Sequence, residues 1–199
     1  DTLDVAFEAA DKQALLRAFL PGNLSDHPSA TLVASRLEAK SAFVVIWTTT
    51  AWTIPANQAL NAHPELTYAL VDTPRGALVL ADTLVEKCLE RYATTGTVIA
   101  TTSGKQLAGL QFKHPLHDVH PGYARLSPLY LADYVSDSDG TGIVHSAPAY
   151  GVDDFNSCVA HDLKYDDILN PVQGNGSYAE DLPLFGGMNI WKACPRILE

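Results

Sequence analysis

The sequence predicts a mixed, β-dominated domain, in which a closed or nearly closed sheet carries helices on its periphery. Many short apolar runs bounded by turn residues indicate strands, and only a few segments have helical periodicity. The 199 residues are 47% hydrophobic and 18% charged, so the chain can bury one substantial core and is not disordered. We expect one domain over residues 1–199, with a connector and peripheral helix in 1–40 and the core in 41–199.

In the first half of the chain, three patterns define the predicted elements. Leu15, Ala18 and Phe19 share one helical face. The continuous apolar run at 43–46 is typical of a strand buried on both faces. Thr83, followed three residues later by Glu86, predicts a capping box at the start of a helix. In order, the segments are an extended stretch at 3–7, a helix around 15–19, a turn-rich connector at 21–28, strands at 43–48, 68–71 and 77–80 (the last two forming a hairpin), and a helix from residue 83.

The second half also alternates short apolar runs with turn residues. A helix that starts near Asp153 is expected to bury an apolar stripe that includes Phe155 and Cys158. The predicted segments are strands at 97–101, 129–135 and 143–146, the helix from residue 153, a short strand near 168, a turn at 174–176 and a terminal helix from about residue 189.

Charge and cysteine content restrict the function. Lys and Arg total 13 against 23 Asp and Glu, a net charge of −10, so at most a short nucleic-acid end is expected to enter this domain. Cys88, Cys158 and Cys194 are odd in number and far apart, which predicts reduced thiols rather than disulfides or a zinc site. No signal peptide is visible and no apolar run approaches the roughly 18 residues of a membrane span, so a cytoplasmic location is expected.

The segment at 47–57, WTTTAWTIPAN, is the most informative feature of the chain. Its three threonines follow a predicted buried strand, so their hydroxyls stand at the end of a rigid element and can donate and accept hydrogen bonds. Pro55 and Asn57 then turn the chain away. This arrangement suits binding a sugar, a nucleotide end or a water molecule. The alternative is a threonine-rich strand terminus without a functional role.

A second segment at 140–155, GTGIVHSAPAYGVDDF, favours a functional role for the threonine segment over a simple strand terminus. Together the two segments resemble the editing (CP1) domain of isoleucyl-tRNA synthetase, a class I aminoacyl-tRNA synthetase, in which a WTTTPWTLPAN-like segment pairs with a distant GTGxVHxAPxxGxxD-like segment. Thr50 stands where the related valyl and leucyl editing domains carry an arginine, and LADYV at 131–135 is also similar to the family. Ala51 departs from the usual proline, which loosens the turn without removing a functional side chain.

The resemblance covers nearly the whole chain and implies a β-barrel-like core with peripheral helices, the fold of the valyl, isoleucyl and leucyl editing domains. It implies post-transfer editing, the hydrolysis of the aminoacyl ester of tRNA(Ile) mischarged with valine. The implied partners are the 3′ end of this tRNA and the rest of a parent synthetase, and the isolated domain is expected to be monomeric and to need no cofactor for editing. The alternatives are a non-catalytic module that holds the tRNA 3′ end and a metal-dependent hydrolase.

Asp154 is expected in the first turn of a helix, where free backbone N–H groups and the helix dipole keep a carboxylate ionised. Such an anion can clamp the α-ammonium of an aminoacyl group. Asp153 is better placed to cap the helix, which leaves Asp154 facing the pocket. The resemblance implies that Asp154 is the amino-group anchor of the family, and the alternative is simple N-capping.

The resemblance also assigns roles within the threonine segment, namely binding of the terminal ribose and positioning of the attacking water. No Ser-His-Asp or Cys-His arrangement indicates an activated nucleophile. An aminoacyl ester is already activated, so an oriented water and stabilisation of the developing oxyanion suffice. The predicted catalytic residues are Thr48, Thr49, Thr50 and Asp154, and the predicted substrate-binding residues are Trp52, Thr53, Asn57, His145 and Asp154.

Four histidines need interpretation. His145 lies on a predicted strand, where a histidine is usually structural, but the resemblance implies that it contacts the substrate. It then either forms a wall that admits valine and excludes isoleucine or hydrogen-bonds the ester region, and both roles stay open. His114, His117 and His120 repeat every third residue and raise a metal hypothesis. Pro115 breaks any helix there, so a solvated loop is favoured and no metal site is expected.

Overall fold

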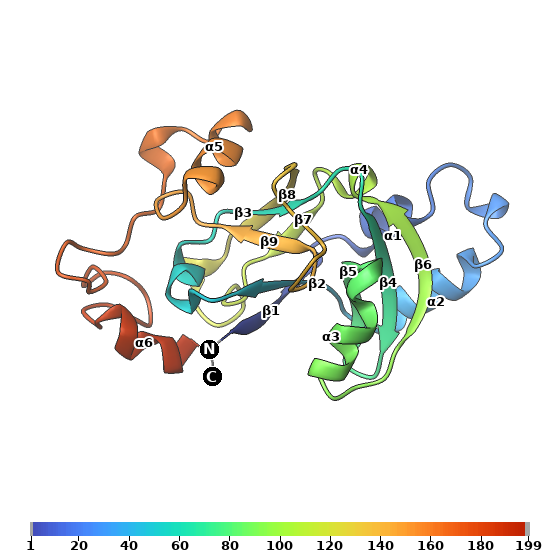
Figure 1. The fold of residues 1–199 in the computed structure, drawn as a ribbon, viewed down its shortest axis with the longest axis horizontal. Coiled ribbons are helices and arrows are strands. Elements are labelled where there is room, and N and C mark those ends of the chain that lie inside the picture. The colour runs from blue at the N-terminus through green and yellow to red at the C-terminus, as the bar shows by residue number, and fades with distance from the viewer. Residues whose placement is uncertain (1, 198–199) are drawn as a thin grey trace.

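The structure is a computed structural model that describes residues 2–197 (Figure 1). Two mixed sheets lie at its centre, a five-stranded sheet with the order β1-β2-β5-β4-β6 and a four-stranded sheet with the order β7-β8-β3-β9. The strands are β1 (Leu3–Glu8), β2 (Ala42–Thr48), β3 (Ala59–Ala62), β4 (Thr67–Thr73), β5 (Gly76–Ala81), β6 (Thr97–Ser103), β7 (Gln111–Lys113), β8 (Leu126–Leu131) and β9 (Ile143–Ser146).

In the first sheet, β1 pairs antiparallel with β2 over six residues, so an edge strand comes from the segment before residue 41. β2 runs parallel to β5, and β5 and β4 form the predicted hairpin. β6 covers the other side of β4, with a bulge between Leu70 and Val71. The sheet thereby holds the apolar run of β2 between two neighbours and presents its last residue, Thr48, at one end.

In the second sheet, β3 lies between β8, to which it is parallel, and β9, to which it is antiparallel. Gly142 stands directly before β9 with a φ of +76°, and a Cβ atom there would collide with the Cβ of Ala81 at the end of β5. Only glycine adopts this positive φ without strain and leaves room for Ala81. Gly142 therefore allows the chain to turn into β9 beside the end of β5.

The predicted mixed fold with peripheral helices is confirmed. Within residues 2–197, however, the two sheets do not close into a barrel. They meet through isolated contacts, such as the 2.9 Å hydrogen bond from Ala81 N to Thr141 O and the bridge between Ala9 and Phe112, rather than through a continuous ladder.

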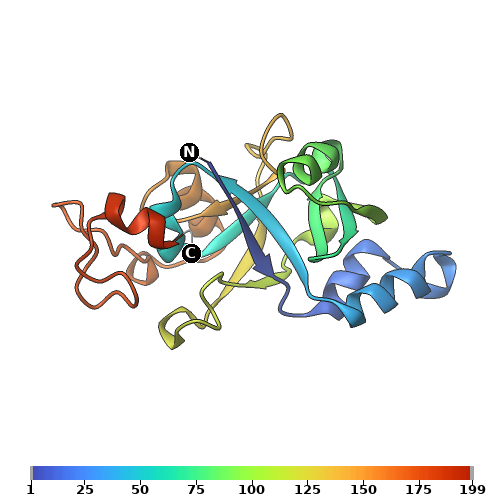
Figure 2. The same cartoon turned by 90° about the horizontal axis from the view of Figure 1, so that it is seen from below.

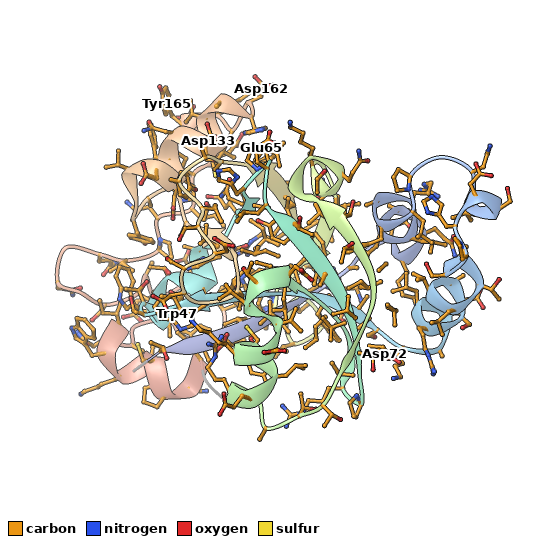
Figure 3. All side chains as sticks on the ribbon, turned by 45° about the vertical axis from the view of Figure 1, so that its right-hand side comes forward. Trp47, Glu65, Asp72, Asp133, Asp162 and Tyr165 are labelled. Atoms are coloured by element: carbon orange, nitrogen blue, oxygen red, sulfur yellow. The ribbon has the colours of Figure 1, made fainter. Side chains whose placement is uncertain are left out.

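The helices lie outside the sheets, α1 and α2 at one end of the molecule and α5 and α6 at the other (Figures 1 and 2). Asp72 on β4 ties α2 to the first sheet, because it accepts a hydrogen bond from Lys40 (2.6 Å) and pairs with Arg36 (3.2 Å; Figure 3). No helix in the described range is both long and apolar enough to cross a membrane. The helices are α1 (Lys12–Phe19), α2 (Ala30–Ala39), α3 (Val85–Arg91), α4 (Gly104–Leu107), α5 (Val152–Ala160) and α6 (Ile190–Ile197), and the 3-10 turns are η1 (Leu24–Asp26), η2 (Ala51–Ala56), η3 (Asp82–Leu84), η4 (Pro121–Tyr123) and η5 (Tyr165–Asp167).

Apolar side chains form two buried clusters. The larger one takes side chains from both sheets and from α1, α2 and α3, and the smaller one binds the C-terminal part of the chain to η2 through Trp52. The smaller cluster consists of Tyr123, Tyr178, Phe185, Ile190 and Ala193.

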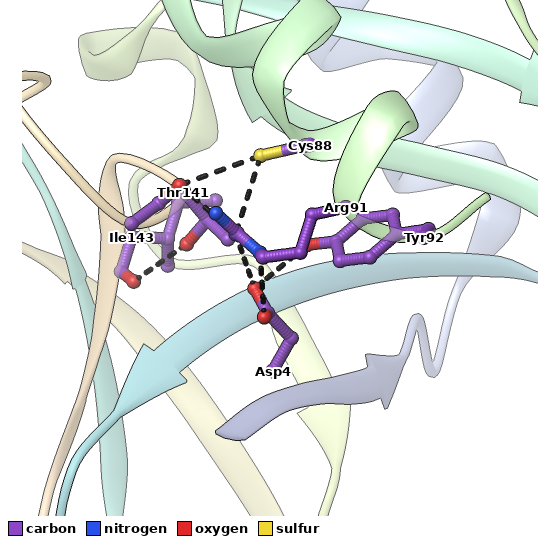
Figure 4. A network of polar contacts seen from close by, with 7 residues as sticks. Asp4, Cys88, Arg91, Tyr92, Thr141 and Ile143 are labelled. Atoms are coloured by element: carbon purple, nitrogen blue, oxygen red, sulfur yellow. Dashed lines mark hydrogen bonds and ion pairs between the residues drawn. The ribbon is translucent and has the colours of Figure 1, made fainter. Parts of the chain in front are cut away.

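A polar cluster joins β1, α3 and the loop before β9 (Figure 4). Both carboxylate oxygens of Asp4 accept hydrogen bonds from Arg91, at 2.6 and 2.9 Å, and Tyr92 Oη donates to Asp4 at 2.8 Å. Arg91 also donates to the carbonyl oxygen of Gly140 (3.2 Å). Asp4 is paired in the sheet with Trp47, so this cluster reaches the start of both sequence motifs.

Several predicted elements differ from the structure. The capping box is wrong, since α3 begins at Val85 and the Thr83 hydroxyl donates to Asp137 instead (2.7 Å). The strand predicted at 129–135 starts earlier and ends at Leu131. The strand predicted near residue 168 is wrong, because the chain there leaves the 3-10 turn η5, which contains Tyr165 (Figure 3), and the nearest pairing is the isolated bridge between Val172 and Tyr178. The elements α2, α4, β3 and β7 were not predicted.

Candidate functional site

The threonine segment forms the bend between β2 and η2. Thr48 is buried, and its Oγ1 accepts a hydrogen bond from the backbone N–H of Thr50 (3.0 Å) and lies 3.2 Å from Thr50 Oγ1. Thr49 and Thr50 are exposed. The hydroxyl of Thr48 therefore shapes the bend, and the next two side chains are accessible to a ligand. Ala51 begins η2, so the turn forms without the proline usual in the family.

Thr53 and Trp52 have different surroundings within η2. The hydroxyl of Thr53 donates to the carbonyl oxygen of Thr50 (2.9 Å) and lies 3.1 Å from Nε2 of His145. Trp52 packs edge-on against Tyr150, with ring centroids 5.0 Å apart. Thr53 therefore connects the threonine segment to β9, whereas Trp52 supports the turn by packing.

Asn57 is fully buried where the chain leaves η2. Its Nδ2 donates to the carbonyl oxygen of Ala59 (2.8 Å) and lies 3.4 Å from Nδ1 of His145, and its Oδ1 accepts a hydrogen bond from Ser127 on β8 (2.6 Å). Arg125 donates to the carbonyl oxygens of Pro55 (2.6 Å) and Asn57 (3.0 Å). The segment after the threonines is thus held by Ser127 on β8 and by Arg125, the residue directly before β8.

His145 is half-buried on β9, and both of its ring nitrogens lie within reach of protein groups, Thr53 and Asn57. Burial lowers the pKa of His145 to about 4. The imidazole is therefore neutral at physiological pH. A neutral ring with both nitrogens engaged is suited to form a fixed wall rather than to act as a general base.

Asp154 lies in the first turn of α5, as predicted, but Asp153 does not cap the helix. Gly151 is the N-cap residue and no side chain caps the helix, since α5 begins at Val152 and Asp153 is exposed. The Oδ2 atom of Asp154 folds back to accept a hydrogen bond from the N–H of Ala147 (2.8 Å). A Cβ atom on Gly151 would lie 2.9 Å from Cγ of Asp154, so glycine leaves the room that this carboxylate needs.

The charge of Asp154 has no cationic partner in the part of the chain that the structure describes, where no lysine or arginine forms an ion pair with it. Burial raises the pKa of the Asp154 carboxyl above its usual value, and the hydrogen bond from Ala147 opposes this shift only in part. Desolvation therefore outweighs the stabilising effect of the backbone hydrogen bonds to this carboxylate.

The fold brings the two motif segments together. Thr53 and Asn57 contact His145 directly, and Asp154 is hydrogen-bonded to the residue two positions after His145. Sequence reasoning missed Ser127 and Arg125, because a single serine and a single arginine next to a predicted strand carry no pattern that marks them.

The three histidines at 114, 117 and 120 do not converge. His114 is buried rather than in a solvated loop, because its Nε2 lies 2.8 Å from the carbonyl oxygen of Ile54 and its ring stacks on Tyr123. His117 contacts Asp118 (2.6 Å), and His120 accepts from its own turn. Among residues 2–197, no three His, Cys, Asp or Glu side chains are grouped to hold a metal ion, and the three cysteines are free thiols.

Solved editing domains of leucyl-tRNA synthetases have a similar fold. The editing domain of the P. falciparum cytosolic leucyl-tRNA synthetase matches with a TM-score of 0.68 at 10% identity, over 100% of this chain and 95% of that one. A crystal structure of GlLeuRS-CP1 matches with a TM-score of 0.67 at 12% identity, over 99% and 92% of the two chains. The fold is therefore that of CP1 editing domains.

A model of the family described as "Leucyl-tRNA synthetase, editing domain" matches residues 75–186, more than half of the chain, and the chain belongs to this family. It is 54% identical over 198 residues to "Isoleucine--tRNA ligase 1" of Burkholderia mallei and to "Isoleucine--tRNA ligase" of Paraburkholderia phymatum, over 100% of this chain and 20% of each of those proteins. The chain thus spans about a fifth of the length of these relatives. The resemblance to isoleucyl-tRNA synthetase editing domains predicted from the two motifs is confirmed.

Proposed function

We propose that this domain hydrolyses the ester bond that links valine to tRNA(Ile), as the proofreading part of a larger cytoplasmic isoleucine–tRNA ligase. Isoleucine and valine differ by one methylene, which is worth only about 1–3 kcal/mol of binding free energy in a hydrophobic pocket. A synthetase that binds isoleucine therefore also attaches valine to the tRNA, and a second site must hydrolyse that product. The domain acts on the 3′ end of the mischarged tRNA, is monomeric by itself and uses no cofactor for editing.

The observation that carries this proposal is the half-buried Asp154 carboxylate without a cationic partner among the described residues. An aminoacyl group brings an α-ammonium, which offsets the desolvation of the carboxylate through a charge-assisted hydrogen bond. Because Asp154 is bonded to Ala147, this anchor lies next to the strand that carries His145.

The exposed threonines supply the remaining polar contacts. Thr49 and Thr50 hold the terminal ribose and orient a water molecule, with Thr48 fixing the bend beneath them. The water oxygen attacks the ester carbonyl carbon, the bond to the ribose oxygen breaks, and a proton from the water passes to that oxygen, with the vicinal ribose hydroxyl as relay. The products are free valine and uncharged tRNA(Ile), and orientation rather than a strong base drives the step.

His145 provides selectivity in this proposal. Its neutral ring is held from both sides by Thr53 and Asn57, so it cannot easily move away from a larger side chain. Valine fits beside the ring and the extra methylene of isoleucine collides with it.

The test is a deacylation time course of the 199-residue chain with tRNA(Ile) carrying valine or isoleucine. Hydrolysis of the valyl ester well above that of the isoleucyl ester is expected. Binding of the tRNA 3′ end without hydrolysis of either ester refutes the proposal in favour of the non-catalytic module.

A further inference from the structure

A continuous chain of hydrogen bonds runs from β8 through His145 to the threonine segment. Ser127 Oγ lies 2.6 Å from Asn57 Oδ1, and Asn57 Nδ2 lies 3.4 Å from His145 Nδ1. His145 Nε2 lies 3.1 Å from Thr53 Oγ1, which is 2.9 Å from the carbonyl oxygen of Thr50. The chain thereby links a serine outside both sequence motifs to the segment proposed to hold the ribose and the water.

The direction of each bond follows from what the groups can donate. The single hydroxyl proton of Thr53 goes to the carbonyl oxygen of Thr50, which can only accept, so Thr53 accepts from Nε2 of His145. At the other end, Asn57 turns its amide nitrogen toward Nδ1, because its oxygen accepts from Ser127. Nδ1 must then carry the lone pair. Only the Nε2–H tautomer of His145 fits both neighbours.

We propose that Ser127 is a positioning residue for deacylation, which acts through Asn57 to hold His145 as the Nε2–H tautomer and so fixes the ring against Thr53 and the Thr50 carbonyl. Its catalytic consequence rests on the proposed function, whereas the tautomer does not. Ser127 and Asn57 are both 0% exposed, so no bulk water replaces the serine hydroxyl when it is removed.

The weakest link in the chain explains why Ser127 is needed. The 3.4 Å contact from Asn57 to His145 is long for a hydrogen bond, and the same amide nitrogen also faces the carbonyl oxygens of Ala59 (2.8 Å) and Ser146 (3.5 Å). A small shift of the amide therefore breaks its contact with the ring. The short bond from Ser127 restrains that shift.

A second serine–asparagine hydrogen bond in the chain provides a control for the Ser127→Ala substitution. Ser157 on α5 donates to Asn61 Oδ1 at 2.6 Å, and Asn61 Nδ2 donates to Ser146 Oγ at 2.5 Å. In both pairs a serine hydroxyl donates to a buried asparagine, Asn57 directly before β3 or Asn61 on β3, but the second pair ends on a hydroxyl instead of an imidazole. Ser157→Ala should thus remove a serine–asparagine hydrogen bond of the same length, from a half-buried rather than a fully buried serine, without changing the ring of His145.

The direct test is long-range ¹⁵N–¹H NMR correlation of the histidine rings at pH 7, with the His145 signals assigned by their loss in His145→Gln. In the wild type, we expect a protonated Nε2 and an unprotonated Nδ1. Ser127→Ala should give a mixture of tautomers, Ser157→Ala should keep the wild-type pattern, and Ser127→Thr should restore it. If Ser127→Ala fails to fold, Ser127→Cys replaces it, because a thiol of similar size is a much weaker donor.

Deacylation of valyl-tRNA(Ile) gives the second readout. Ser127→Ala should lower kcat by on the order of tenfold with KM little changed, since the substrate still binds but the site is less well ordered. A wild-type His145 protonated on Nδ1, or a Ser127→Ala variant with the wild-type tautomer and rate, overturns the proposal. A wild type that does not deacylate at all refutes the proposed function instead, while the NMR result still decides on the tautomer.

Discussion

Replacing Asp154 by asparagine separates the charge of this residue from its structural role. Asparagine has the same shape, and its side-chain oxygen can still accept the 2.8 Å hydrogen bond from the N–H of Ala147. Only the negative charge that anchors the substrate ammonium is lost. Removing one partner of such a buried charge pair costs roughly 2–5 kcal/mol, which corresponds to a fall in kcat/KM of roughly 30-fold to several thousandfold.

Although Asp154→Asn should lower activity, it should not lower the stability of the fold. Because burial raises the pKa of Asp154 in the folded state, the ionised carboxylate is less favourable there than in the unfolded chain. This penalty is present above the folded-state pKa and is relieved as the pH falls through it. Asp154→Asn should therefore leave Tm unchanged or raise it. Asp154→Ala also removes the acceptor of the buried Ala147 N–H and should cost about 1–3 kcal/mol.

The assay compares deacylation of valyl-tRNA(Ile) with that of N-acetylvalyl-tRNA(Ile), which lacks the α-ammonium. The variant should be defective on the first substrate and nearly equal to wild type on the second. Asp153→Asn is the matched control, since it removes an exposed charge from the same helical turn. Wild-type hydrolysis of valyl-tRNA by Asp154→Asn would refute the anchor assignment.

Three further predictions concern selectivity, metal dependence and pH. His145→Ala should increase hydrolysis of Ile-tRNA(Ile) by roughly tenfold to a hundredfold, because overpacking typically costs about 1–3 kcal/mol, and equal slowing of both substrates in time courses would contradict the sieve. Deacylation should survive EDTA, and a rate lost on chelation and restored by zinc would disprove the metal-free mechanism. Burial lowers the pKa of His114 to about 3, so below about pH 6.5 the unfolded chain binds a proton that the folded chain does not. His145, with a pKa of about 4, adds a similar effect. Between pH 6.5 and 5 urea unfolding should therefore show a loss of roughly 3 kcal/mol in the wild type, and about half of that loss should be absent in His114→Gln.

The elements predicted from the sequence are those with strong local patterns. The continuous apolar run of β2 and the turn between β4 and β5 can be recognised without tertiary information. By contrast, β3 is only four residues long and contains Asn61, a polar residue that is buried because Ser146 and Ser157 satisfy its amide. Pairing partners far away in sequence decide such a strand, so periodicity cannot indicate it.

The residues of the candidate site also fall into those that the sequence indicates and those that only the structure shows. The threonines, Asn57, His145 and Asp154 are candidates because the family resemblance of the two motifs implies them. Neither Ser127 nor the N-cap role of Gly151 could be predicted. Ser127 reaches Asn57 only because β8 runs beside β3, and α5 begins one residue earlier than the paired aspartates indicate.

The cluster of Asp4, Arg91 and Gly140 has a mechanical consequence for the site. Asp4 is paired with Trp47 at the start of one motif, and Arg91 connects it to Gly140 at the start of the other (Figure 4). The two motif segments are thus held together where they begin, in addition to the contacts of Thr53 and Asn57 with His145, and the exposed threonines and α5 lie outside these contacts. If the site opens to admit or release a tRNA end, as the proposed function requires, the cluster and the His145 contacts should stay in place, and the largest displacement should be at the exposed threonines and at α5.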